Sequence, residues 1–176
     1  KAAGALPHAK IALVLASKPG VYALERASKA GVPGIVVARK SYAAPEEYDA
    51  ALLAALREHR IDVVVLAGFL SILGPSVITA YSERILNVHP SLIPSFCGAG
   101  YYGLKVHEAA LACGVKVTGA TVHFVNEIPD AGKIILQKAV EVREGDTPET
   151  LQRRVMEEAE WQLLPQAVAM FCQGEI

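Results

Sequence analysis

Residues 85–94 read Ile-Leu-Asn-Val-His-Pro-Ser-Leu-Ile-Pro, an apolar run that leads directly into polar side chains and two prolines. Asn87 and His89 are two positions apart, so they point to the same side of a continuing strand. Pro90 and Pro94 stiffen the loop that follows. Ligands bind at the carboxyl ends of strands in parallel α/β sheets. This stretch therefore predicts a strand end that presents an amide beside a titratable imidazole.

Upstream of this stretch, short apolar runs alternate with segments of helical periodicity. The apolar runs at 10–15, 34–37 and 62–66 are predicted strands. Residues 21–30 and 45–59 carry apolar side chains at helical spacing and are predicted helices. Because each predicted strand is apolar throughout, the pattern favours a parallel sheet that is covered on both faces.

The predicted helix at 45–59 is amphipathic. Its apolar face is formed by Tyr48, Leu52, Leu53 and Leu56. Its acidic residues lie mostly elsewhere, and Asp49 is therefore expected on the polar side.

Downstream, the pattern becomes β-rich. Residues 117–125 and 133–142 are two long runs joined by 126–132, which predicts an antiparallel pair or a sheet edge. Residues 148–171 then predict a terminal helix, with Pro165 as the point where it could break. The economical interpretation is one α/β domain over 1–176.

Composition and charge exclude several classes of protein. Of the 176 residues, 52% are hydrophobic and 20% are charged, which is typical of a globular chain. The net charge of −1 provides no global field to attract nucleic acid or an anionic membrane. No apolar run has the length of a membrane span and no signal peptide is evident, so a cytoplasmic location is expected. The three widely spaced cysteines predict neither a disulfide framework nor a zinc site.

Residue spacing alone leaves the candidate catalytic residues open. An Asn-x-His pair at a strand end is more often a satisfied polar pair than a catalytic one, and Pro129-Asp130-Ala131-Gly132 is ordinary turn chemistry. His123 is expected to be packed in its strand or to support the active site, and His107 is expected at the surface or as a cap. The glycine-rich segment 96–103 is expected to be a flexible loop beside the active site, and it lacks the spacing of a nucleotide-binding motif.

Four segments together resemble the folate-dependent formyltransferase family, which uses 10-formyltetrahydrofolate. They are 62–69, 87–94, 118–125 and 130–137. The likeness extends from about Leu13 to the C-terminus. It implies a Rossmann-like formyltransferase fold, with a mostly parallel sheet, helices on both faces and an antiparallel C-terminal strand pair.

The resemblance also assigns roles to residues. The catalytic Asn, His and Asp of the family fall on Asn87, His89 and Asp130. The folate site is implied at Leu66, Phe69, Leu70, Ser71, Ile72, Leu73, Asn87, Ile128, Pro129 and Asp130. The amine substrate is implied to contact Val88, Pro90 and Glu160, the last when one extra residue is allowed in the terminal helix. No metal is implied.

These residue types suit formyl transfer to an amine. Negative charge develops on the formyl oxygen as the amine attacks, and the Asn87 amide and a protonated His89 are suitable donors to it. Asp130, directly or through a water, can mediate the proton transfers and keep His89 charged.

Within the family, the likeness is greatest to the members that formylate glycinamide ribonucleotide in de novo purine synthesis. Small-molecule partners, no nucleic acid, no membrane and a monomer or homodimer are expected. The alternatives are a formyltetrahydrofolate hydrolase, a relative of the methionyl-tRNA formyltransferases, and a non-catalytic fragment that binds folate.

Two departures from the family pattern stand out. Family members usually begin with a strand and a Gly-rich turn that grips the substrate phosphate. The sequence lacks that segment, residues 1–7 look like the end of the helix that follows it, and a truncated N-terminus is expected. Ser71 stands where some relatives carry an Arg.

Overall fold

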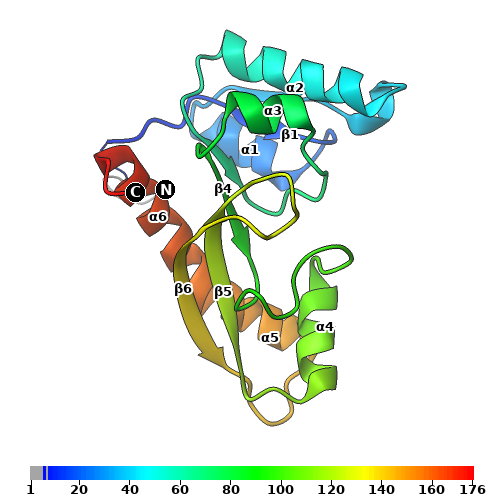
Figure 1. Ribbon diagram of the computed structural model, residues 1–176, viewed down its shortest axis with the longest axis vertical. Coiled ribbons are helices and arrows are strands. Elements are labelled where there is room, and N and C mark those ends of the chain that lie inside the picture. Colours follow the sequence, from blue (N-terminus) through cyan, green and yellow to red (C-terminus); the bar gives the residue numbers. More distant parts are fainter. Residues whose placement is uncertain (1–5, 7) are drawn as a thin grey trace.

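The computed structural model describes residue 6 and residues 8–176, and Figure 1 shows how their helices and strands are arranged. The strands are β1 (Val14–Ala16), β2 (Gly34–Val36), β3 (Val64–Leu66), β4 (Ile85–His89), β5 (Val117–Phe124) and β6 (Ile134–Glu141). The helices are α1 (Tyr22–Lys29), α2 (Pro45–Glu58), α3 (Pro75–Ala80), α4 (Leu104–Cys113), α5 (Pro148–Val155) and α6 (Trp161–Gln173). A 3-10 turn, η1 (Arg39–Ser41), precedes α2, and a π-helix, η2 (Met156–Glu160), joins α5 to α6. The predicted helix end at 1–7 falls, except for Leu6, outside the described residues.

The strands form two sheets. β1 pairs with β2 in parallel, and the second sheet has the order β3-β4-β5-β6. β3 and β4 are parallel, whereas β4 with β5 and β5 with β6 are antiparallel. The predicted antiparallel pair at the C-terminal end is thus confirmed, and its antiparallel character extends one strand further, to β4.

Strand β4 is buried on both faces, as its apolar sequence predicts. Leu86 and Val88 pack into a hydrophobic cluster with residues of β5, α5 and α6. Ile85 packs into a second cluster with residues of α2 and α3. Because side chains alternate along a strand, Asn87 and His89 lie on the same face of the sheet as Ile85.

The prediction that Asp49 lies on the polar side of its helix is wrong. Asp49 is buried, and its carboxylate accepts hydrogen bonds from the backbone N–H groups of Gly74 (2.8 Å), Ser76 (2.9 Å) and Val77 (3.3 Å). These are free donors at the start of α3, so Asp49 caps that helix from α2. Gly74 permits the contact, because a Cβ there would lie 2.7 Å from the Asp49 carboxyl carbon.

The terminal helix is interrupted before Pro165 rather than at it. Pro165 lies inside α6, and the irregular turn is η2, whose last residue is Glu160. A proline ring displaces the carbonyl four residues earlier, here that of Trp161, and a wider turn at that point accommodates the displacement. None of the helices over residues 6 and 8–176 has the length and hydrophobicity to cross a membrane.

Candidate active site

The carboxyl end of β4 presents Asn87 and His89. Asn87 is half-buried and lies opposite His123 in the register of β4 and β5, and His89 is buried opposite Thr121. The pairing of β4 with β5 therefore fixes the relative backbone positions of Asn87, His89 and His123.

Both ring nitrogens of His89 face hydrogen-bond acceptors. Nε2 lies 2.9 Å from the backbone oxygen of Phe96, to which it donates. Nδ1 lies 3.5 Å from Oδ2 of Asp130. Nε2 therefore has a hydrogen-bond acceptor, and Nδ1 faces a carboxylate oxygen at a longer distance.

Asp130 reaches the site from the connection between β5 and β6. That connection is closed by a hydrogen bond from Phe124 N–H to the Lys133 carbonyl, 2.9 Å. Gly132 passes so close to β5 that a Cβ would lie 1.7 Å from the Phe124 oxygen. Asp130 itself has a φ of 57°, in the left-handed region that Asp tolerates better than most residues. Asp130 therefore lies in a turn, and its carboxylate lies beside the ring of His89.

The carboxylate of Asp130 is held in its ionised form. Burial raises the pKa of this group, whereas the facing His123 ring, the Gly98 N–H at 2.8 Å and the charge of His89 lower it. The net effect is a pKa below the ordinary value. At neutral pH the site therefore contains a carboxylate beside His89.

The segment 96–103 lies beside the site, as expected, and its backbone contacts two of the site residues. It supplies the Phe96 oxygen to His89 and the Gly98 N–H to Asp130. Phe96 and Gly98 both have positive φ values, 50° and 84°. The sequence did not reveal these particular contacts, because they are made by backbone atoms and not by side chains. The density of glycines was the available signal.

A polar network beneath the site fixes the loop after β4. The Thr121 hydroxyl donates to the Ser91 oxygen (2.7 Å) and accepts from Ile93 N–H (3.1 Å). The Gln137 amide donates to the Ile93 oxygen at 3.0 Å. Strands β5 and β6 thereby hold the proline-rich loop in place, which the prolines alone do not achieve.

His107 lies in the interior, contrary to the expected surface or capping role. It is completely buried on α4. Burial, and to a lesser degree the charge of His89, lowers the pKa of His107 to about 4. His107 is therefore a neutral core residue at physiological pH.

The apolar residues implied to hold folate differ in exposure to solvent. Leu70, Ile72 and Ile128 are 70%, 80% and 65% exposed, an unusual degree for large apolar side chains. Leu73 is buried and Leu66 and Phe69 pack against the core, so a ligand could reach Leu73 only through its backbone. Of the remaining residues, Ser71 is half-buried and Pro129 is exposed.

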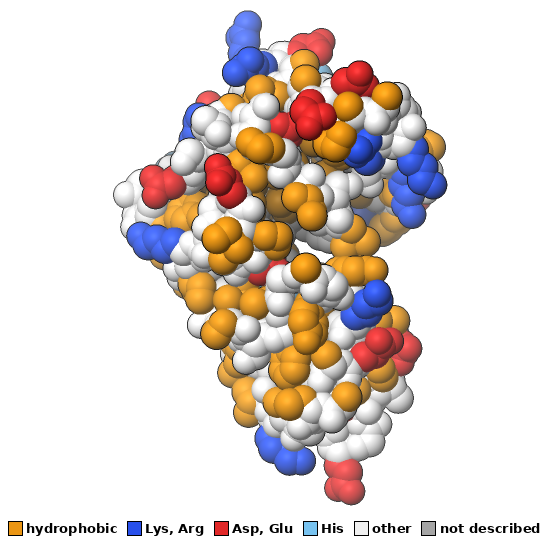
Figure 2. Space-filling model, turned by 45° about the vertical axis from the view of Figure 1, so that its right-hand side comes forward, with side chains coloured by type: hydrophobic (Ala, Val, Ile, Leu, Met, Phe, Trp, Pro, Cys, Tyr) orange, Lys and Arg blue, Asp and Glu red, His pale blue; other side chains and the backbone are white. Residues whose placement is uncertain are grey.

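A surface hollow borders the segment that carries Ile128. It is lined by α3 residues including Ile78 and by part of 124–133. Figure 2 shows hydrophobic side chains spread over much of one face of the molecule, and an indentation between its upper and lower halves.

The residues implied to bind the amine substrate are not brought together by any direct contact. The Val88 side chain lies in the core and Pro90 is half-buried. Glu160 ends η2, and the structure gives it no hydrogen bond or ion pair with the residues it describes. Burial raises the pKa of Glu160 to about 7.

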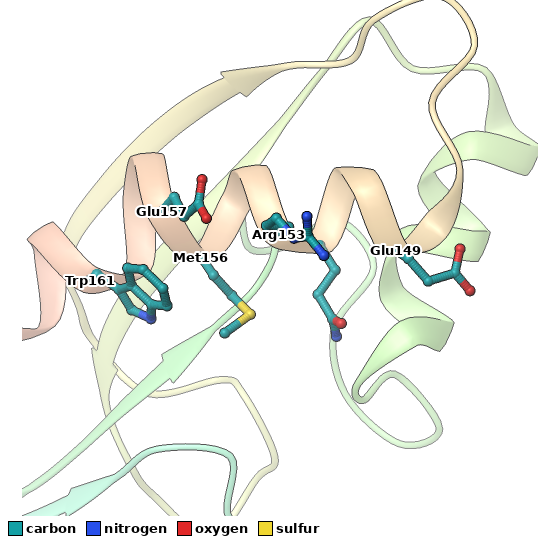
Figure 3. A pocket seen from close by; sticks show the side chains of 6 residues that line it. Glu149, Arg153, Met156, Glu157 and Trp161 are labelled. Atoms are coloured by element: carbon teal, nitrogen blue, oxygen red, sulfur yellow. The ribbon is translucent and has the colours of Figure 1, made fainter.

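A second hollow lies along α5 and α6, away from Asn87, His89 and Asp130. Figure 3 shows its lining, which includes Arg153, Met156 and Trp161. Over residues 6 and 8–176, no group of three or more His, Cys, Asp or Glu side chains has an arrangement that could hold a metal ion.

Comparison with known proteins identifies the family. A family model described as "Formyl transferase" matches residues 2–168. The trifunctional purine biosynthetic protein adenosine-3 of Gallus gallus is 44% identical over 168 residues, which are 96% of this chain and 16% of that protein. The chain thus spans a small part of the length of that curated relative.

Two solved structures agree with this match in both fold and sequence. Glycinamide ribonucleotide transformylase 1 from Symbiobacterium toebii has a TM-score of 0.88 and 42% identity, covering 94% of this chain and 75% of its own. Phosphoribosylglycinamide formyltransferase from Bacillus halodurans has a TM-score of 0.89 and 38% identity, covering 99% and 86%. The fold predicted from the resemblance is confirmed, and the chain belongs to the formyl transferase family, in the branch of the phosphoribosylglycinamide formyltransferases.

Proposed function

We propose that the protein transfers the formyl group of 10-formyltetrahydrofolate to the amine of glycinamide ribonucleotide. One observation carries the proposal: Asn87, His89 and Asp130 converge at the carboxyl end of β4, from two segments far apart in sequence. The names of the relatives, glycinamide ribonucleotide transformylase and phosphoribosylglycinamide formyltransferase, support the same reaction.

In this reaction a bond forms between the amine nitrogen and the formyl carbon, and the bond from that carbon to the folate nitrogen breaks. One proton leaves the amine and one reaches the departing nitrogen. Asn87 and protonated His89 provide N–H groups for the charge that grows on the formyl oxygen. His89 Nε2 donates its proton to the Phe96 carbonyl. A ligand oxygen that replaced this carbonyl would accept the same hydrogen bond without any rearrangement of His89.

Asp130 acts as the proton acceptor and as the counter-charge. Its lowered pKa keeps it ionised at neutral pH, and its Oδ2 lies close to His89 Nδ1. As a counter-charge, the carboxylate lies beside the imidazole ring of His89. It can also accept the proton of the attacking amine, directly or through a water.

The site offers suitable surfaces to both small molecules. The exposed side chains of Leu70, Ile72 and Ile128 would cover the flat, apolar rings of a folate. Glu160 would meet the amine substrate, whose positive charge a carboxylate attracts. A cytoplasmic location and a monomeric or homodimeric state stay predictions.

Turnover tests the proposal. The protein is mixed with 10-formyltetrahydrofolate and glycinamide ribonucleotide, and the folate absorbance is followed. His89→Ala and Asp130→Asn should each lower kcat by about a hundredfold or more, since each removes a group that acts on the transition state. The exposed residues His8 and Asp62 provide the matched controls His8→Ala and Asp62→Asn, which should retain full activity.

The same assay separates the alternatives. Loss of the formyl group without any amine would indicate a hydrolase and would overturn the proposal. Binding of folate with no turnover under any condition would leave a non-catalytic role. Formyl transfer to methionyl-tRNA in preference to the ribonucleotide would place the protein with another branch.

A further inference from the structure

His123 lies beside the catalytic residues but has no part in the chemistry described so far. It is only 1% exposed on β5 and faces Asn87 across the strand pair. A histidine that is buried against a catalytic amide is either a packing residue or a residue that sets the orientation of that amide. The hydrogen bonds of its two ring nitrogens decide between these roles.

The Nδ1 atom of His123 carries a proton. It lies 2.7 Å from the backbone oxygen of Phe124. A carbonyl oxygen can only accept a hydrogen bond, so Nδ1 must donate. The contact is made with the next residue of the same strand, and it therefore persists as long as β5 keeps its conformation.

The Nε2 atom of His123 carries a lone pair. It lies 3.1 Å from Nδ2 of Asn87. An amide nitrogen can only donate a hydrogen bond, so Nε2 must accept. These two contacts assign the donor role to Nδ1 and the acceptor role to Nε2.

Asp130 also faces this nitrogen, but at a greater distance than Asn87 does. Its Oδ1 lies 3.6 Å from His123 Nε2, which is beyond hydrogen-bond distance. The Asp130 carboxylate instead receives the Gly98 N–H at 2.8 Å. The nearer and better-defined partner of His123 Nε2 is thus Asn87.

We propose that neutral His123 is a positioning residue, which fixes the Asn87 amide so that one of its N–H bonds is held by the ring and the other faces the reacting formyl oxygen. The proposal rests on the proposed role of Asn87 as a donor to that oxygen. If Nε2 carried a proton, its N–H and the N–H of Asn87 Nδ2 would face each other without an acceptor. The Asn87 amide would then rotate by about 180° and place its oxygen toward the ring. The donor offered to the substrate therefore depends on the tautomer of a residue that never touches it.

Three variants distinguish positioning from packing by activity. His123→Leu removes the acceptor while filling much of the space, and we expect kcat to fall about tenfold to a hundredfold with little change in KM. His123→Gln keeps an acceptor and should recover part of that loss. His123→Ala measures the cost of an empty space. Equal kcat in the Leu and Gln variants at equal folded fraction would overturn the positioning role.

Nuclear magnetic resonance tests the tautomer without any turnover. In the full chain with ¹⁵N-labelled histidine, the nitrogen shifts of His123 should show a protonated Nδ1 and an unprotonated Nε2. Asn87→Asp offers only acceptors to the ring, and it should put a second proton on His123. A proton on Nε2 in the unmodified protein would overturn the proposal.

The two readouts also separate this proposal from the proposed function. If the unmodified protein shows no turnover with glycinamide ribonucleotide, the proposed function fails, while the tautomer and its response to Asn87→Asp can still be measured. If turnover is normal but the tautomer is wrong, only the role of His123 fails.

Discussion

The backbone N–H of Gly98 donates to Oδ2 of Asp130 at 2.8 Å, and this same oxygen lies 3.5 Å from the ring of His89. One carboxylate oxygen thus joins the loop after β4 to the loop after β5. The contact lowers the pKa of Asp130, which keeps the carboxylate in the form that accepts a proton.

Gly98→Ala should disturb this contact. Gly98 has a φ of 84°, which a residue with a Cβ rarely adopts, so the peptide should rotate and withdraw its N–H. Loss of a hydrogen bond to a charged group corresponds to a fall in kcat of about tenfold to a hundredfold. The pKa of Asp130 should rise, which steady-state kinetics would report as an upward shift of the acidic limb of the rate profile.

Gly100→Ala is the matched control for that variant. Gly100 lies in the same loop with a φ of 92°, and a Cβ at either glycine would meet no atom within 4 Å. The two substitutions therefore carry a similar backbone cost, and only one of them affects Asp130. Similar losses of activity in both would show that loop strain, and not the Gly98 hydrogen bond, controls the rate.

Asp49→Ala should destabilise the protein by about 2–3 kcal/mol, because it leaves the N–H groups at the start of α3 without an acceptor. Since α3 begins two residues after Leu73, at Pro75, the segment with Leu70 and Ile72 should also loosen and bind folate more weakly. Urea unfolding and folate titration measure the two effects. Glu46→Ala, at an exposed position of the same helix, should change neither.

Glu160→Gln should stabilise the protein increasingly as the pH rises. The pKa of Glu160 in the folded state is about 7, above its ordinary value, so its contribution is present at low pH and is lost as the pH rises through 7. The variant cannot ionise, and it should gain about 2 kcal/mol on the unmodified protein between pH 4 and pH 8. A gain that does not change with pH, measured by urea unfolding, would contradict this account.

The same variant should bind the amine substrate more weakly at high pH. In the unmodified protein, ionisation of Glu160 should lower KM for the amine as the pH passes through about 7, and this change should be absent after Glu160→Gln. Glu157→Gln, at an exposed position of the same π-helix, is the control for both measurements.

Asp146→Asn should weaken the protein at neutral pH but not in strong acid. Both guanidinium nitrogens of Arg154 lie 2.6 Å from Asp146 oxygens, and the pair holds the pKa of Asp146 well below its ordinary value. The stabilisation is therefore present above about pH 4 and declines as the pH falls further. Thermal unfolding should show a loss of about 2 kcal/mol at pH 7 that shrinks towards pH 2.

The sequence was sufficient to predict the fold wherever one segment determines its own structure. The apolar run of β4, the amphipathic face of α2 and the β-rich runs of β5 and β6 all appear where their patterns predict them. The errors occur where a distant partner decides. Asp49 is buried because α3, 25 residues away, offers it free N–H groups. No helical pattern contains that information.

The site, like the fold, has features that the sequence could predict and features that it could not. Side chains at a strand end could be recognised from residue types, and resemblance grouped them with Asp130. The contributions of Phe96 and Gly98 could not be predicted, because a backbone oxygen and a backbone N–H are present at nearly every position. The proposed tautomer of His123 depends on which atoms face its two ring nitrogens, and residue types do not determine that.

The loop at 96–103 contacts His89 and Asp130 through main-chain atoms, and this has an evolutionary consequence. Residues such as Cys97 and Ala99 should be replaceable in homologues, because the contacts to His89 and Asp130 do not involve their side chains. A single insertion or deletion, by contrast, would move the Phe96 oxygen and the Gly98 N–H out of register together. Natural variation in this loop should therefore be rich in substitutions and poor in changes of length between Phe96 and Gly98.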